Sequence, residues 1–479
     1  MSDETTEREE LFSAYVEALA SVIGHADREK PLGDYCRGLL TNCERKSVEP
    51  LAAITAPDRT AAQHQSLLHF VGNGGWSDEK VLAKVRDLVL PALQRQGPIE
   101  AWIVDDTGLP KKGAHSVGVA HQYCGQRGKQ ENCQVAVSLS LANASASLPV
   151  AYRLYLPQAW AADADRRAKA HVPEEVEFRT KPEIALEQIR AALASDLPRG
   201  VVLMDAGYGV NSAFRAGVSE LGLPYVAGVL SSTSVWPPGV EPLPPKPYTR
   251  GLGRPSKRLR RDEEHRPVSV KELALSLPKK AWRVITWREG TNARLKSRFA
   301  RLRVRPAHLD YERSQPWPEE WLLIEWPNGE QEPTQYWLST LPATIGLAAM
   351  VRMAKLRWRI ERDYQELKQE VGLGHFEGRS WRGFHHHATL CIAAYGFLIS
   401  ERLTIPPSGP RYAAPGPATA VPRDSRSRRS AAANRTSRPQ LDRHDAPQPQ
   451  HRDSPPPATM PVLRSPTHAN TRTPHFMTQ

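Results

Sequence analysis

The chain has few cysteines for its length. Five occur in 479 residues, and no two of them form a Cys-x-x-Cys pair. A disulfide scaffold or a zinc knuckle needs paired or clustered cysteines. The sequence therefore indicates neither kind of site, and we expect reduced thiols in a cytoplasmic protein.

A long hydrophobic run and a secretory signal are also missing. The longest strongly apolar stretch, residues 388–399, is too short to cross a bilayer and predicts a buried helix. The first ten residues, MSDETTEREE, are acidic and polar, which is the opposite of a signal peptide. We therefore expect no membrane partner and a cytoplasmic location.

Positive charge is in excess but unevenly spread. The 64 Lys and Arg against 52 Asp and Glu give a net charge of +12. Residues 403–479 contain eleven Arg, no Lys and four Asp, so this segment carries +7 and residues 1–402 carry +5. The excess favours a polyanionic partner, but a nucleic-acid site within residues 1–402 must come from local clusters of basic side chains.

The ends of the chain differ in pattern from its middle. Residues 1–97 carry helical periodicity interrupted by glycines and prolines, which predicts a small helical domain for DNA binding, dimerisation or packing. Residues 403–479 hold 15 of the 42 prolines and no Trp, a composition typical of a disordered tail.

The middle of the chain predicts an α/β fold. In residues 98–229, strands at 101–104, 133–141, 149–156, 200–204 and 225–229 surround helices at 184–193 and 211–221. This is the element order of a ribonuclease-H-like catalytic domain. Residues 230–343 interrupt it with a β-rich insertion that has strands at 282–287, 299–305, 321–326 and 335–341, and residues 344–402 return to helices.

Three acids stand at positions that this fold brings together. Asp105 follows the first predicted strand, Asp205 follows the fourth, and Glu361 lies on a helix predicted over residues 356–368. Carboxylates this close repel one another unless divalent cations lie between them, and Mg²⁺ suits an all-oxygen site. Two such ions, for which Mn²⁺ can substitute, support phosphodiester cleavage and strand transfer. Asp106 is an alternative ligand, but its neighbour Thr107 gives a spacing that favours Asp105.

The predicted helix 356–368 places basic side chains beside the third acid. Arg357, Glu361 and Lys368 fall near one helical face, while Ile360 and Tyr364 begin an apolar stripe on the other. The arrangement suits an enzyme that holds a metal ion and a phosphate backbone together. The alternative is an amphipathic helix with ordinary intrahelical ion pairs.

Several motifs in order resemble the DDE transposases of bacterial insertion sequences, most closely the insertion-sequence seven-hundred-one family within the Tyr-Arg-Glu-Lys signature group. The resemblance spans about residues 10–402. Its motifs are WIVDDTGLPKKG (102–113), GVAHQYCGQRGKQENCQ (118–134), VVLMDAGYG (201–209), SRFARLRVR (297–305) and RWRIERDYQELKQEVGLGHFEGRSWRGFHHH (357–387).

The resemblance implies an activity and roles for individual residues. Asp105, Asp205 and Glu361 would be catalytic metal ligands, with Arg357 and Lys368 contacting DNA near the scissile phosphate. The protein would bind terminal inverted repeats, act as a homodimer in the synaptic complex, and cleave and join DNA. The alternatives are a non-catalytic DNA-binding remnant and a structure-selective nuclease of the same fold.

One position departs from the family pattern, and other residues carry weaker expectations. The signature tyrosine falls at Ala354, so one contact is missing or supplied elsewhere. His385, His386 and His387 are expected to form a helix start with a DNA-facing surface rather than a metal site. Most tryptophans of the insertion should be core, although one could stack on a flipped base. Further phosphate contacts, against the alternative of solvated loops, are Lys111, Lys112, Arg254, Lys257 and Arg258.

Overall fold

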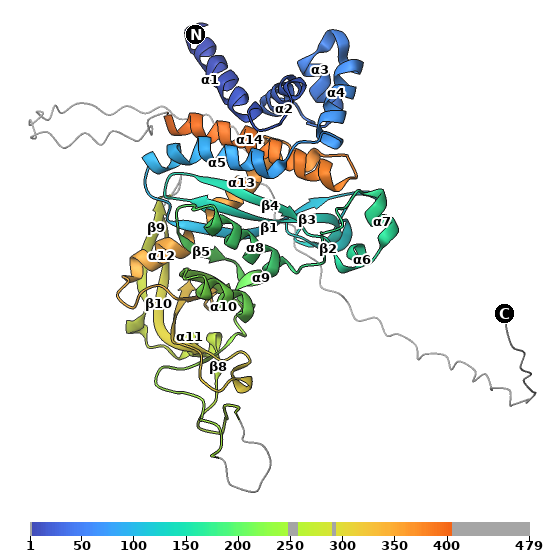
Figure 1. Cartoon of the computed structure of the whole chain (residues 1–479). Helices are drawn as coiled ribbons and strands as arrows, with labels where there is room; N and C mark the ends of the chain where they lie inside the picture. The colour runs from blue at the N-terminus through green and yellow to red at the C-terminus, as the bar shows by residue number, and fades with distance from the viewer. Residues whose placement is uncertain (1, 248–256, 290–293, 405–479) are drawn as a thin grey trace, which may run out of the picture. The chain divides into compact units, whose positions relative to one another are not determined.

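The computed structural model describes residues 2–247, 257–289 and 294–404 (Figure 1). The predicted tail lies outside these residues apart from Leu403 and Thr404. Arg254, one of the expected phosphate contacts, also lies outside them.

The chain opens with helices, as its periodicity predicts. They pack against a long helix from the other end of the described chain, α14 (Trp381–Thr404), which lies beside α5 in Figure 1. The hydroxyl of Tyr15 donates to the Ala393 carbonyl at 2.9 Å across this interface. The opening helices are α1 (Ser2–Ala20), α2 (Glu29–Leu40), α3 (Val48–Thr55), α4 (Thr60–Gly72) and α5 (Asp78–Arg95).

The next section forms a mixed α/β layer whose element order agrees with the ribonuclease-H-like prediction. In the sheet β1 lies parallel to β5 and β5 lies parallel to β6, while β3 runs antiparallel to β1. The strands are β1 (Ala101–Pro110), β3 (Lys129–Ala142), β4 (Ser147–Leu154), β5 (Val201–Met204) and β6 (Tyr225–Val229), and the helices between them include α8 (Lys181–Ala194) and α10 (Ser212–Glu220).

The predicted β-rich insertion continues the same sheet. Its last strand, β12 (Gln335–Ser339), pairs antiparallel with β6, and β11 (Glu320–Trp326) and β10 (Arg294–Pro306) follow outward. β9 (Arg283–Glu289) also pairs with β10. The edge beyond β10 is formed by β7 (Ser234–Trp236) and β8 (Val268–Ser269), and the short helix α11 (Val270–Ser276), which was not predicted, begins at a Ser269–Glu272 capping box.

Two details of the predicted strands are wrong. β1 does not end at Asp105 but runs on to Pro110, because β3 pairs with it along its whole length. Gly108 lies within the strand, where an added Cβ would meet the Cys124 Sγ at 2.8 Å. Between the first two predicted strands the chain forms a further strand that was not predicted, β2 (Ala120–Cys124), which makes a hairpin with β3.

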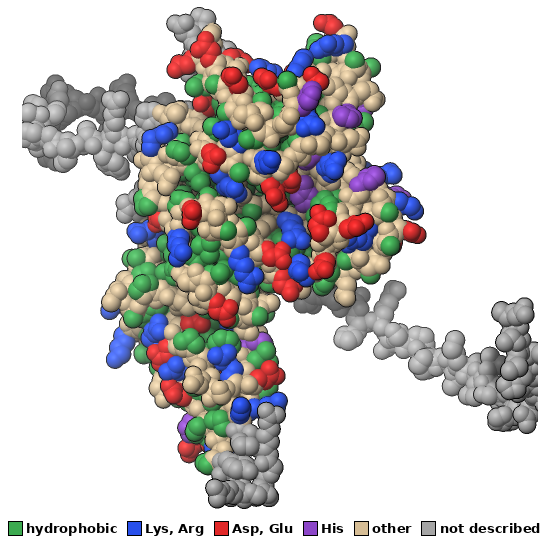
Figure 2. All heavy atoms as spheres, viewed as in Figure 1, with side chains coloured by type: hydrophobic (Ala, Val, Ile, Leu, Met, Phe, Trp, Pro, Cys, Tyr) green, Lys and Arg blue, Asp and Glu red, His purple; other side chains and the backbone are tan. Residues whose placement is uncertain are grey.

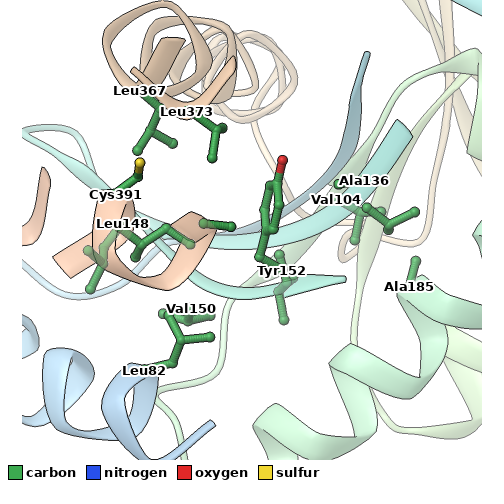
Figure 3. Packing of buried hydrophobic residues seen from close by; sticks show 14 of the residues in the cluster. Leu82, Val104, Ala136, Leu148, Val150, Tyr152, Ala185, Leu367, Leu373 and Cys391 are labelled. Carbon is green, nitrogen blue, oxygen red and sulfur yellow. The ribbon is translucent and has the colours of Figure 1, made fainter. Parts of the chain in front are cut away.

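Two hydrophobic clusters hold the layers together. In the larger one, Leu82 of α5 and Cys391 of α14 lie on either side of β4 residues Leu148 and Val150 (Figure 3). The smaller one joins Ile103 of β1 and its neighbours to the last helices before α14, namely α12 (Leu347–Lys355) and α13 (Trp358–Gln369). Burial on this side holds α12 and α13 against the sheet near Ile103 and Leu203.

Candidate active site

The site begins at the turn between α12 and α13. The helix predicted over residues 356–368 starts at Trp358, so Arg357 is its N-cap and Glu361 lies in its first turn. Ile360 and Tyr364 are buried beneath it, as the apolar stripe predicts. The Tyr364 hydroxyl bonds the Ser138 hydroxyl of β3 at 2.8 Å, which fixes the rotation of α13 over the sheet.

Arg357 connects the helix to the first strand. Its Nη1 donates to Asp105 Oδ2 at 2.7 Å, and its Nη2 donates to Glu361 Oε1 at 3.0 Å. One guanidinium therefore bridges two acids that are 256 residues apart in the sequence. This contact brings together three of the residues that the sequence selected.

Asp205 lies on the neighbouring strand at the same level as Asp105. β1 and β5 are parallel and end their pairing at Ile103 and Leu203, so each acid follows the last paired residue by two positions. Adjacent strands lie roughly 4.8 Å apart, and residues two apart share a face. Asp205 also caps a short helix, because its Oδ1 accepts the Tyr208 amide at 3.2 Å.

The pKa values of Asp105 and Arg357 reflect their burial and the neighbouring carboxylates. Burial raises the pKa of Asp105 to about 7, with Asp205 and Asp106 adding to the rise and Arg357 opposing it. Burial alone would lower the pKa of Arg357, but the neighbouring carboxylates outweigh it and the pKa is raised. The carboxylates therefore stabilise the positive charge of Arg357.

Asp106 is held by other partners. Its Oδ2 accepts Lys181 Nζ at 3.0 Å and the Tyr208 hydroxyl at 3.3 Å. Consecutive side chains on a strand point to opposite faces, so Asp106 faces away from α13 while Asp105 faces toward it. This geometry favours Asp105 over Asp106 as the site carboxylate.

The basic side chains near the site bond backbone carbonyls. Lys368 Nζ donates to Gly108 O at 3.0 Å, three residues beyond Asp105 on the same strand. Lys111 Nζ donates to Phe376 O at 2.6 Å, and burial lowers its pKa to about 8. Lys112 beside it is exposed. Lys368 thus lies against β1 near Asp105, Lys111 is held at the Phe376 carbonyl beyond the end of β1, and Lys112 faces solvent.

Lys257 and Arg258 are not brought to the acids. Both are exposed, and Leu259 next to them bonds Arg313 in the segment after β10. β10 is separated from β1 by β5, β6, β12 and β11, so five strand spacings of about 4.8 Å place it roughly 24 Å away. On the face shown in Figure 2, basic and acidic side chains are intermixed.

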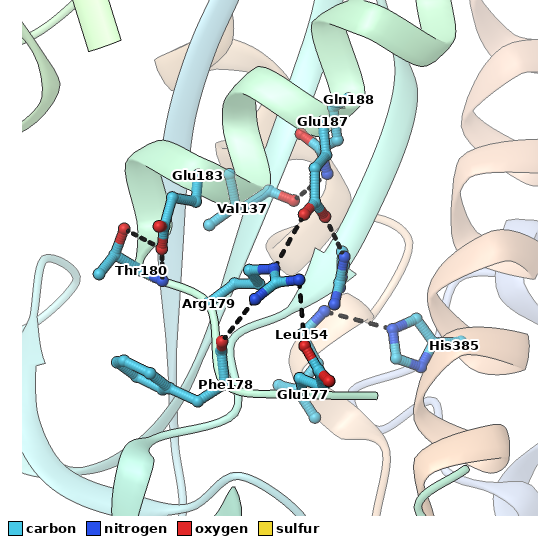
Figure 4. Close-up of polar contacts among 11 residues, drawn as sticks. Val137, Leu154, Glu177, Phe178, Arg179, Thr180, Glu183, Glu187, Gln188 and His385 are labelled. Atoms are coloured by element: carbon cyan, nitrogen blue, oxygen red, sulfur yellow. Dashed lines mark hydrogen bonds and ion pairs between the residues drawn. The ribbon is translucent and has the colours of Figure 1, made fainter. Parts of the chain in front are cut away.

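The three consecutive histidines are buried, so the prediction of a DNA-facing surface is wrong. His385, His386 and His387 lie inside α14 with at most 7 % exposure. His385 Nε2 accepts the Leu154 amide of β4 (Figure 4), and His387 bonds the Tyr35 hydroxyl and the Gly372 carbonyl. Their ring nitrogens join α14 to the elements packed around it.

A cavity of about 310 Å³ opens beside Asp205 and Glu361 and was not predicted. Asp205, Glu361 and Ala354 line it, together with Trp287, Gln335, Trp337 and Trp358. Ala354 occupies the position of the signature tyrosine, so this position forms part of the cavity wall.

Lys355 closes one side of this cavity. Its Nζ bonds Glu325 Oε2 at 2.5 Å and lies over the rings of Trp287, at 4.8 Å from the centroid, and Trp337, at 5.5 Å. We did not predict a role for Lys355 from the sequence. The available signal was its place next to Ala354, the signature position, together with the tryptophans in the predicted strands of the insertion.

The side chains of Asp105, Asp205 and Glu361 carry oxygen atoms of the kind that bind divalent cations. Among the described residues no group of three or more His, Cys, Asp or Glu side chains is arranged to hold a metal ion. Asp105 and Glu361 nevertheless share one cation, the guanidinium of Arg357, and Asp205 stands on the adjacent strand. Carboxylate oxygens of this kind are the donors that Mg²⁺ takes.

Comparisons with known proteins identify the family of the chain. Residues 18–294 match the family described as DDE superfamily endonuclease, a stretch that includes Asp105 and Asp205 and ends before Glu361. Such endonucleases generally use divalent metal ions. Within residues 2–247, 257–289 and 294–404, no helix is long and apolar enough to span a bilayer.

The chain is also similar to a protein from Microchaete diplosiphon named "Probable transposase for insertion sequence element IS701". The two are 29% identical over 196 residues, which cover 41% of this chain and 47% of the relative. The chain thus matches about half the length of that curated relative. Both comparisons confirm the resemblance seen in the motifs, and the chain belongs to the DDE superfamily endonucleases.

Proposed function

We propose that this chain is a DNA transposase that binds the terminal inverted repeats of an insertion sequence and catalyses DNA cleavage and strand transfer. The observation that carries the proposal is the Arg357 bridge between Asp105 and Glu361, just beyond the point where the pairing of β1 with β5 stops at Ile103 and Leu203. It supports one site built from a strand and a late helix, as the motifs imply.

In this proposal Asp105, Asp205 and Glu361 are the metal ligands. Two Mg²⁺ ions, for which Mn²⁺ can substitute, would supply activation of the attacking oxygen and stabilisation of the leaving one. The chain's own contribution is position: Ser138 and Tyr364 fix α13, and the parallel strands hold the two aspartates at one level.

The basic residues around the acids would hold the DNA. Arg357 and Lys368 border the site and are the proposed contacts near the scissile phosphate, with Lys111 and Lys112 along the same edge. Lys257, Arg258 and Arg254 would contact DNA farther along. A homodimer would hold the two element ends together, in a cytoplasmic protein associated with the nucleoid when DNA is bound.

The test removes one charge at a time from the acids. Asp105→Asn, Asp205→Asn and Glu361→Gln keep side-chain size, so each should lose at least about 100-fold in cleavage and joining while DNA binding survives. Double changes should add little, because the residues act as one unit. The assay uses a labelled duplex of the element end with Mg²⁺ or Mn²⁺, scored by gel shift and on a denaturing gel.

Glu370→Gln is the matched control, since Glu370 is an exposed acid at the far end of the same helix. It should cut like the parent chain. Binding without cleavage by the parent chain would identify a non-catalytic DNA-binding protein, and cleavage without joining would identify a nuclease. Full activity in soluble Glu361→Gln would remove α13 from the catalytic site.

A further inference from the structure

The guanidinium of Arg357 lies where two of the acids meet. It is one quarter exposed, at 25%, while the Asp105 side chain beneath it is only 16% exposed and the Glu361 side chain is 66% exposed. The bridge therefore covers the buried acid and leaves the helix acid facing solvent. One guanidinium neutralises at most one of the three neighbouring carboxylates.

A second arginine on α13 shows what an ordinary pair looks like. Arg362 bonds Glu366 at 2.6 Å with the same four-residue spacing as Arg357 and Glu361. The Arg362 side chain is 57% exposed, and Glu366 lies on its own helix. Arg357 differs because it also reaches β1, so its position depends on Asp105 as well as on the helix.

We propose that Arg357 is a displaceable counter-ion, which holds Asp105 and Glu361 together in the metal-free chain and leaves their oxygens when a divalent cation binds there. This inference rests on the proposed function, in which these acids are metal ligands. A cation coordinated at about 2.1 Å by oxygens that also accept from Arg357 would lie close to the guanidinium and be repelled by it.

Displacement has two consequences for the site. A cation must compete with charge-assisted hydrogen bonds from a single guanidinium to two acids, which favours a divalent over a monovalent ion. Once released, the guanidinium at the start of α13 is available to a DNA phosphate. Metal and DNA then strengthen each other's binding, because coupling between two ligands is reciprocal.

The first test measures metal binding without any catalysis. Isothermal titration of the full chain with Mg²⁺ or Ca²⁺ at pH 8.5 compares the parent with Arg357→Gln, Arg362→Gln and Asp105→Asn. Arg357→Gln should bind the ion about tenfold more tightly, a change equivalent to about 1.4 kcal/mol. Arg362→Gln, which removes the same charge from the same helix, should bind like the parent, and Asp105→Asn should bind weakly.

The outcomes separate the inference from the proposed function. If neither the parent nor Arg357→Gln binds the ion, the metal site itself is wrong. If the parent binds and Asp105→Asn does not, but Arg357→Gln binds equally or less tightly, the metal site stands and the counter-ion role of Arg357 is overturned.

A second measurement needs no substitution. Arginine labelling with phenylglyoxal, followed by peptide mass spectrometry, should modify Arg357 faster when Ca²⁺ is present, because the guanidinium has left its two acids. Arg362 should be labelled at the same rate with and without the ion. An unchanged or slower rate at Arg357 in a chain shown to bind Ca²⁺ would overturn the proposal.

Discussion

Single residues at this site fall into those that the sequence could predict and those that it could not. The placement of Asp105 beside Asp205 was predictable, because strand order sets which strands of a parallel sheet are neighbours. Tyr208 and Lys181 were not, because their role comes from contacts with Asp106 across 102 and 75 residues. Local sequence patterns do not predict contacts between residues so far apart in the chain.

Tyr208 is expected to act as a positioning residue for Asp205. Its amide donates to the capping carboxylate of Asp205 and its hydroxyl donates to Asp106, so Tyr208→Phe loosens the turn that follows the acid. We expect cleavage to fall several-fold at unchanged DNA binding, with about 1 kcal/mol lost from folding stability. Single-turnover cleavage and a gel shift measure the two effects.

The control for this change is Tyr336→Phe. Tyr336 is also buried and donates its hydroxyl to a carbonyl, that of Pro333, away from the acids. It should lose similar stability without a loss of cleavage. Equal slowing by both variants would show that the Tyr208 effect is one of general stability.

At the scale of helices and strands, the sequence predicted whether a segment is a helix or a strand better than it predicted what its side chains contact. The strands of the insertion and the buried helix around residues 388–399 are present because alternation and apolar runs reflect burial directly. β2 was missed because its five residues lie among glycines and gain their structure from pairing with β3. The histidines of α14 were misplaced because polar side chains look exposed until their buried partners are known.

His387 illustrates this burial and predicts acid sensitivity. Burial lowers its pKa from the usual 6.5 to about 4. A histidine whose folded pKa is depressed contributes stability above the unfolded pKa, and this is lost as pH falls from about 6.5 to 4. His387→Gln should be less stable at pH 7 but should lose less stability between pH 7 and pH 5, by about 2 kcal/mol.

Urea unfolding of the parent and His387→Gln at pH 7 and pH 5 measures this difference. His69→Gln serves as the comparison, since His69 is exposed on α4. It should show the same acid dependence as the parent. If His387→Gln also keeps the full acid dependence of the parent, the buried ring of His387 is not responsible for it.

At the scale of the whole described chain, the insertion and the catalytic strands form one sheet. The predicted boundary at residues 229 and 230 falls just after β6, yet β12 returns to pair with β6 along Val226–Val229. Sequence patterns do not reveal this pairing, because it joins segments more than 100 residues apart. Asp205 at the end of β5 therefore depends on strands that come after it in the chain.

This continuity predicts how a distant core change reaches the active site. Leu338 of β12 is fully buried and pairs with Ala227 of β6, so Leu338→Ala should cost about 2–5 kcal/mol. Hydrogen exchange should rise in β11 and β12, and also in β6 and β5 next to Asp205. Val235→Ala, a smaller truncation of a fully buried side chain on β7, should raise exchange only around β7, β8 and β10. If Leu338→Ala left exchange in β5 and β6 unchanged, the insertion would fold independently of the strands that carry the acids, despite their shared hydrogen bonds.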